Sequence, residues 1–165
     1  MGQEPRAHRH RTAPPLYTPE QRRRRDASRW TLVQGILAPV QFLVMLASTV
    51  LLVRYLATGE GWTASAVSVV VKTATLYAIM VTGSIWEKVV FGKWLFAPAF
   101  FWEDVFSMLV LALHTAYLAG LLLPGVPEAA LAWLALAAYA VYAVNAVQFV
   151  LKLRAARLQQ REAGG

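Results

Sequence analysis

The sequence contains no cysteine among its 165 residues, and only 15% of the residues are charged. The absence of cysteine excludes disulfide bonds, cysteine-ligated zinc and catalysis by a thiol. Histidine is scarce as well, and His114 is the only one outside the N-terminal arm, which excludes ligation of a haem by two histidines. A soluble domain carries about a quarter charged residues. A chain with so little charge and 58% hydrophobic residues is typical of a membrane protein.

The charges that are present gather at the two ends of the chain. The formal net charge is +7, and arginines precede the first apolar stretch while Lys152 and further arginines follow the last. Basic tails on a soluble protein favour nucleic-acid binding. These tails flank apolar segments too long for a small globular core, so they indicate membrane topology, and we expect no nucleic-acid partner.

The polar N-terminal region divides into two parts. We expect residues 1–17 to form a disordered basic arm, because they are polar and carry little that could enter a core. The sequence TPEQ then predicts a helix start, with Thr18 as N-cap, Pro19 as the first helical residue and Gln21 completing a capping box. The helix predicted over 18–29 carries the RRRRDASR run to the membrane surface, where arginines can meet anionic lipids.

Four apolar segments are long enough to cross a membrane, since about 20 apolar residues span the hydrocarbon core. They are predicted at 30–56, 64–86, 103–123 and 129–151. We therefore expect an all-α integral membrane protein with a four-helix transmembrane domain over 30–158 and a tail over 159–165. Four spans place both termini on one side, and the positive-inside rule identifies that side as the cytoplasm.

The segment between the second and third spans reads GSIWEKVVFGKWLFAPAFFWEDVFSM and concentrates acids and tryptophans. It also holds Lys88 and Lys93, which agrees with a cytoplasmic position. The centre of the segment is too apolar for a solvated loop and too short to span, so we predict an interfacial aromatic connector. Its simplest role is an aromatic belt that anchors the helix ends at the level of the lipid headgroups.

Three acids in this segment, Glu87, Glu103 and Asp104, are harder to explain as anchors. They are predicted at the ends of the second and third spans, where poor solvation and like-charge neighbours can keep a carboxylic acid protonated near neutral pH. A protonated carboxyl can act as a general acid while an ionised neighbour acts as a base. The alternative, that Glu87 and Lys88 are solvated interface charges, stays open from the sequence.

Polar residues also fall inside the predicted spans. His114 lies about 15 Å from Asp104 along a helix, and an ionisable group at that depth is a functional candidate. The alternative is a neutral imidazole bonded to a neighbouring helix. Lys72 lies about as deep from the other side, with no acid at its depth, and we expect it to snorkel outward. Asn145 shares a face with Gln148, and such residues more often join helices than bind a ligand.

Long stretches of the sequence are similar to one known family. LYTPEQRRRRDAS, WTLVQGILAPVQFLV, VVVKTATLYAIMVTGSIWEKVVFGKWLFAPAFFWEDVFSMLVLALHTAYL and NAVQFVLKLRAARL resemble the 3-vinyl bacteriochlorophyllide hydratase family of bacteriochlorophyll biosynthesis, over about residues 16–158. The resemblance implies a lyase of the bacterial inner, photosynthetic membrane. Its expected reaction adds water to the 3-vinyl group of chlorophyllide a or 3-vinyl bacteriochlorophyllide a, giving the 3-(1-hydroxyethyl) product. No catalytic residue is carried over from the family.

Hydration of a vinyl group requires an acid for the terminal carbon, a positioned water for the inner carbon and a base for that water. We hypothesise that Glu87 and one of Glu103 or Asp104 form the acid–base pair, without a cofactor or metal of the protein's own. The candidate substrate-binding residues are Trp86, Phe100, Phe101 and Trp102 for the macrocycle, Lys88 or Lys93 for its propionate, His114 as an axial ligand to the substrate's magnesium, and Lys72 and Asn145 as further polar groups.

The expected partners are the tetrapyrrole substrate and the lipid bilayer. Other enzymes of bacteriochlorophyll biosynthesis and a second copy of the chain, in a homo-oligomer, are further candidates. The alternative function is that of a non-catalytic tetrapyrrole-binding or assembly protein of the photosynthetic membrane. Such a protein would use the same aromatic residues and His114, but it would not need a carboxylate pair.

Overall fold

The computed structural model describes residues 15–163, and within that range it contains helices and no strand. The helices are α1 (Pro19–Ala27), α2 (Arg29–Thr58), α3 (Trp62–Phe91), α4 (Phe101–Leu122) and α5 (Glu128–Ala163). Four of these described helices, α2 to α5, are long and apolar enough to cross a membrane. The predicted all-α fold with four long apolar helices is therefore confirmed.

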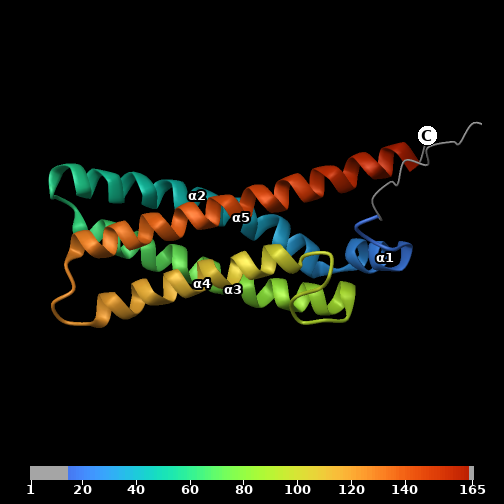
Figure 1. Cartoon of the computed structure of the whole chain (residues 1–165), viewed down its shortest axis with the longest axis horizontal. Coiled ribbons are helices and arrows are strands. Elements are labelled where there is room, and N and C mark those ends of the chain that lie inside the picture. The colour runs from blue at the N-terminus through green and yellow to red at the C-terminus, as the bar shows by residue number, and fades with distance from the viewer. Residues whose placement is uncertain (1–14, 164–165) are drawn as a thin grey trace, which may run out of the picture.

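The long helices lie side by side and alternate in direction, so the bundle has two distinct ends (Figure 1). The turn end carries the short connections 59–61 and 123–127. The connector end carries the connector, residues 92–100, together with α1 and the last turns of α5. The first and the last described residues consequently lie at the same end of the bundle.

The polar helix α1 forms for the local reason that the sequence indicates. The Thr18 hydroxyl accepts the Gln21 amide at 3.2 Å, and the Gln21 side chain accepts the Thr18 amide at 2.9 Å, which completes the capping box. The helix ends at Ala27 because Ser28 is extended, with φ −85° and ψ 128°. The Ser28 hydroxyl accepts the Trp30 amide and thereby starts α2 as a separate helix.

The helices continue past the ends of the apolar stretches. Helix α3 runs to Phe91, beyond the predicted span end at Trp86, and stops at Gly92, whose φ of 79° is a left-handed conformation that glycine adopts readily. Helix α5 likewise runs to Ala163. Hydropathy marks where the apolar residues end and not where the backbone stops being helical. As a result Glu87 lies on a helix, near its end, and not in a loop.

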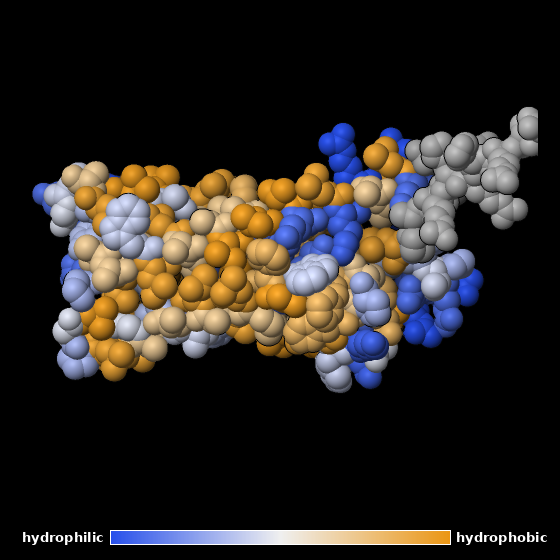
Figure 2. Space-filling view, in the orientation of Figure 1, coloured by the Kyte–Doolittle hydropathy of each residue, from blue (hydrophilic) through white to orange (hydrophobic). Residues whose placement is uncertain are grey.

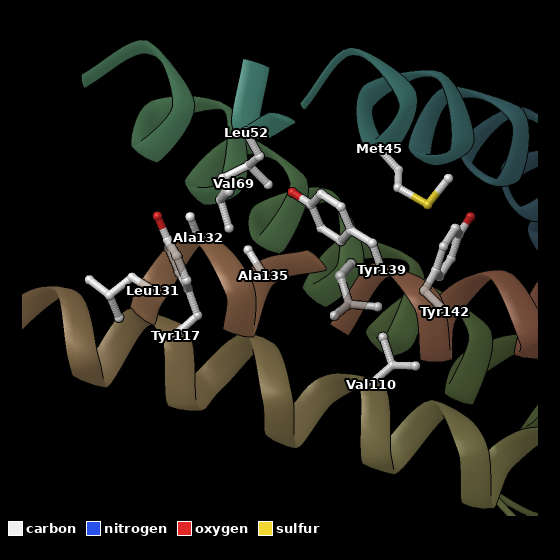
Figure 3. Close-up of a cluster of buried hydrophobic side chains, with 11 residues drawn as sticks. Met45, Leu52, Val69, Val110, Tyr117, Leu131, Ala132, Ala135, Tyr139 and Tyr142 are labelled. Atoms are coloured by element: carbon white, nitrogen blue, oxygen red, sulfur yellow. The ribbon is translucent and has the colours of Figure 1, made fainter. Parts of the chain in front are cut away.

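The core of the bundle lies between α2 to α5, and it includes tyrosines as well as aliphatic residues. Figure 3 shows Tyr117 of α4 and Tyr139 and Tyr142 of α5 among Leu52, Val69 and Ala135. Large apolar side chains such as Leu32 and Leu122 are exposed on the outside. Figure 2 shows this apolar surface over the middle of the bundle, with hydrophilic residues gathered toward its ends. A lipid-facing surface has this distribution.

The four long helices form two hairpins, because α2 packs mainly against α3 and α4 mainly against α5. Hydroxyl groups join the hairpins. The Ser48 hydroxyl of α2 lies 2.7 Å from the hydroxyls of both Ser68 on α3 and Tyr139 on α5. The Tyr77 hydroxyl of α3 lies 2.8 Å from that of Thr115 on α4. Such bonds help the helices to associate specifically, because in a membrane an apolar side chain packs as well against lipid as against another helix.

Ser48→Ala removes the hydroxyl that connects α2 to both α3 and α5. We expect the free energy of unfolding to fall by roughly 1 kcal/mol, the usual net value of a buried hydrogen bond, and Tm in detergent to fall by about 2–4 °C. Thr49→Ala is the matched control, because the Thr49 hydroxyl bonds only the Met45 carbonyl of its own helix. Equal shifts in thermal unfolding of the two variants would contradict a role of Ser48 in joining the hairpins.

Candidate functional site

The three predicted acids come together at the connector end. Glu87 lies near the end of α3, and Glu103 and Asp104 lie in the first turn of α4; each is at most 5% exposed. Glu87 and Asp104 lie close enough for the charge of each carboxyl group to affect the other. Glu87 is therefore not a solvated interface charge, whereas its neighbour Lys88 is exposed.

The connector holds this acid pair from its other side. The backbone amide of Phe96 donates to Asp104 Oδ2 at 2.7 Å, and the next amide, that of Ala97, donates to Glu87 Oε2 at 3.1 Å. Phe96 has a φ of 58°, which is uncommon for a residue with a side chain. Two successive amides thus bind one carboxyl each, which fixes the two acids relative to each other.

The third acid has a cation of its own. Lys152 Nζ of α5 lies 2.6 Å from Glu103 Oε2 and also donates to the Ala99 carbonyl of the connector at 2.5 Å. Among the described residues, the ion pairs include neither Glu87 nor Asp104. Two carboxylates in contact repel each other when both are ionised, and one proton shared between them removes that repulsion. The Glu87–Asp104 pair is thus suited to hold one acid and one base.

Lys152 is a part of this site that the sequence does not predict. In the sequence it is one of several basic residues that follow the fourth span. Lys152 reaches Glu103 because α5 stays helical beyond its apolar stretch, and the hydropathy of the sequence does not predict that the helix continues. The one signal available is a lysine close to the end of an apolar span, at the same end of the bundle as the three acids.

An aromatic cluster lies beside the acids and consists of Tyr17, Trp86, Phe91, Phe100 and Phe149. Tyr17 stacks on Phe91 with ring centroids 5.8 Å apart, and Phe100 stacks on Phe149 at 5.7 Å. The Trp86 indole donates to the Thr31 hydroxyl of α2 at 2.9 Å. Tyr17 was assigned to the disordered arm, but it is buried because its ring completes this cluster.

The predicted aromatic residues do not form one continuous surface. Trp86 and Phe100 belong to the aromatic cluster, whereas Phe101 and Trp102 are 44% and 66% exposed. The two lysines predicted for the propionate are both exposed, and Lys88 donates to the Gly92 carbonyl at the end of α3.

The polar residues of the spans lie deeper in the bundle. Asn145 Nδ2 donates to the Ser107 hydroxyl at 2.8 Å, which joins α5 to α4. His114 Nδ1 lies 2.8 Å from the Val110 carbonyl of its own helix. Lys72 is fully buried, with its ammonium 4.1 Å from the centre of the Tyr142 ring. The expectation that Lys72 snorkels outward is therefore wrong, because the aromatic ring holds the ammonium inside.

Two further features bear on chemistry. A shallow hollow of about 290 Å³ lies toward the turn end, and the residues that line it, among them Trp62, Val70 and Leu121, include no acid or base. Within residues 15–163, no group of three or more histidines, cysteines or acids is placed to hold a metal ion. This hollow is consequently not a candidate for acid–base chemistry.

The fold and the acid pair define an all-helical membrane protein equipped for acid–base chemistry. The family model described as 2-vinyl bacteriochlorophyllide hydratase matches residues 17–155, and the chain belongs to this family. A protein of that name from Cereibacter sphaeroides is 64% identical over 148 residues, covering 90% of this chain and 92% of the relative. Another protein of that name, from Rhodobacter capsulatus, is 60% identical over 144 residues, which cover 87% of this chain and 84% of the relative. No solved structure matches the chain.

Lys152→Met leaves the Glu103 carboxylate buried without its cation. We expect the free energy of unfolding to fall by roughly 3 kcal/mol, the low end for a broken buried ion pair, since Lys152 is partly exposed. Adding Glu103→Gln to Lys152→Met should restore a large part of that loss, because the amide carries no charge. Arg154→Met, which removes an exposed cation of the same helix, is the control. Denaturant unfolding in detergent compares wild type with these three variants, and a double variant as unstable as Lys152→Met would rule out the ion pair as the cause.

Proposed function

We propose that the chain is a hydratase of bacteriochlorophyll biosynthesis. It adds water across the vinyl group of chlorophyllide a or 3-vinyl bacteriochlorophyllide a to give the 3-(1-hydroxyethyl) product. Membership of the family and the two relatives named 2-vinyl bacteriochlorophyllide hydratase support this reaction. The position numbers 2 and 3 denote one vinyl group under two conventions for numbering the macrocycle. The observation that carries the mechanism is that Glu87 and Asp104 are both buried and are each bound by one of two successive connector amides, those of Ala97 and Phe96.

In this mechanism one carboxyl of the pair gives its proton to the terminal vinyl carbon, and the π electrons form the new carbon–hydrogen bond. The positive charge on the inner carbon is delocalised into the macrocycle. Water attacks that carbon, and the ionised carboxylate accepts the proton that water loses. The two acids have then exchanged protonation states. Because they touch, the proton can pass back between them, and the reaction consumes only water and the alkene.

The contacts favour Glu87 and Asp104 over Glu103 as this pair. Glu103 is bound to Lys152, so its carboxylate is already engaged by an ammonium group of the protein. We assign Glu103 a positioning role, because it ties the start of α4 to α5 beside Asp104. The reaction as proposed needs an acid, a water and a base, and no resident cofactor enters it.

The substrate is proposed to approach the acids along the membrane interface. Exposed Phe101 and Trp102 offer apolar rings at the start of α4, and Trp86 and Phe100 pack beside the acids. Exposed Lys93 supplies a cation for an arriving propionate. His114 remains the candidate axial ligand to the substrate's magnesium. Its Nδ1 donates to the Val110 carbonyl, so a neutral ring presents a lone pair on Nε2.

We further propose that the connector end faces the cytoplasm of the bacterial inner, photosynthetic membrane, with the connector at the interface. The basic residues of α1 and of the end of α5 lie at this end, whereas Arg54 is the basic residue near the turn end. Figure 2 shows hydrophilic residues toward both ends of the bundle, with the larger group at the connector end. The positive-inside rule and the polybasic attraction to anionic lipids both support this orientation.

Glu87→Gln and Asp104→Asn each remove one member of the acid pair while keeping its shape. We expect each variant to lose at least about 100-fold in kcat, the lower range for general acid–base catalysis. Conversion of chlorophyllide a by the purified protein, followed by chromatography of the vinyl and 1-hydroxyethyl compounds, measures this loss. Glu128→Gln is the control, because this acid lies at the turn end.

Two outcomes would contradict the proposal in different ways. Full activity of both Glu87→Gln and Asp104→Asn would refute the carboxyl mechanism but leave the hydratase function intact. A wild-type protein that binds chlorophyllide a and forms no hydroxyethyl product would instead support the tetrapyrrole-binding alternative. Thermal unfolding of each variant excludes loss of the fold as the cause of lost activity.

A further inference from the structure

Several buried polar atoms in the middle of the bundle have no hydrogen-bond partner among the described residues. They include Lys72 Nζ of α3 and His114 Nε2 of α4, whose residues are 0% and 1% exposed, and the side-chain oxygens of Gln41 and Asn145. Buried polar groups in proteins almost always have a hydrogen-bond partner, and the cost of lacking one is high where lipid replaces water. This concentration of unpaired groups therefore points to a ligand.

The charge of Lys72 specifies the kind of ligand. The face of the Tyr142 ring attracts the ammonium, but it supplies no negative charge. Glu87, on the same helix, is fifteen residues away, a rise of about 22 Å. Glu103 and Asp104 lie at the connector end, and Glu128 at the turn end. Among the described residues Lys72 forms no salt bridge, so the group that would complete this site is an anion.

The distance between Lys72 and the acid pair restricts the length of the ligand. Lys72 Nζ lies over Tyr142, which precedes Lys152 by ten residues of α5, a rise of about 15 Å. Lys152 binds Glu103, next to the acid pair. The anion site thus lies about 15 Å along α5, or about 22 Å along α3, from the acid pair, so a ligand that reaches both must be long and carry its anionic group on an extended arm. Asn145, with its unpaired carbonyl oxygen, lies on α5 between the two positions.

We propose that Lys72 binds the carboxylate of the substrate while the vinyl group lies at the Glu87–Asp104 pair. This inference rests on the proposed function, because the macrocycle is the molecule that carries both groups. The substrate's carboxylate supplies the anion that Lys72 lacks, and this ion pair fixes the position of the macrocycle relative to the acid pair. Lys72 is then a specificity-determining residue. It selects the free acid against pigments whose carboxylate is esterified, since an ester leaves the buried ammonium without a counter-ion.

The test compares the binding of chlorophyllide a and of its methyl ester to the purified protein, by absorbance titration. Wild type should bind the free acid at least about tenfold more tightly than the ester, a difference of about 1.4 kcal/mol. Lys72→Met should lose this preference, because the variant should bind the free acid more weakly than wild type does and should bind the ester with unchanged affinity. Because it removes an uncompensated buried charge, this variant should unfold at the same temperature as wild type or higher.

Arg54→Met is the control, since it removes an exposed positive charge at the turn end and should keep the preference. Equal binding of acid and ester by wild type would overturn the inference. So would a preference that survives Lys72→Met, or one that Lys88→Met or Lys93→Met abolishes instead, because the carboxylate would then stay at the interface.

The same measurements separate this inference from the proposed function, because binding needs no turnover. If wild type hydrates acid and ester equally well, the Lys72 site is refuted and the hydratase function stands. If wild type forms no hydroxyethyl product but shows an acid preference that depends on Lys72, the anion site stands and the hydratase function is refuted.

Discussion

The contact between Glu87 and Asp104 is the constraint around which the connector end is built. Two acids that meet out of water repel each other unless a proton or hydrogen-bond donors offset their charge. Here the amides of Phe96 and Ala97 donate to them, and the left-handed backbone at Phe96 turns these amides to the acids. The length of α3, the course of the connector and the start of α4 all serve to hold one pair of carboxyl groups together.

A second constraint applies deeper in the bundle, where polar groups must find partners within the protein. Ser48 with Tyr139, and Asn145 with Ser107, meet this requirement across helices. Lys72 meets it only in part, through the face of the Tyr142 ring. Ser48 and Asn145 thus join helices, whereas Lys72 has no anionic partner among the described residues. The requirement that buried polar groups find partners therefore underlies both the packing of the helices and the proposed recognition of the substrate.

The sequence predicts much of the fold, because the length of an apolar stretch and a capping box are local properties. The helix start at Thr18 and the four long apolar helices are examples. For the site, the sequence predicts which acids and aromatic residues take part, but not which of them contact one another. The meeting of Glu87 with Asp104 depends on α3 continuing to Phe91, and the roles of Lys152 and Tyr17 depend on which distant rings and acids they meet. No periodicity in the sequence carries that information.

The site draws on both ends of the described chain. Tyr17, before the first helix, stacks on Phe91, and Lys152, late in the last helix, binds Glu103. A membrane protein enters the bilayer from its N-terminus, so the acids of α3 and α4 are in place before their lysine arrives. The surroundings of the acids are completed only when α5 docks. Assembly of the site therefore depends on the docking of α5, and a chain that stops before Lys152 keeps its three acids without the lysine that binds Glu103.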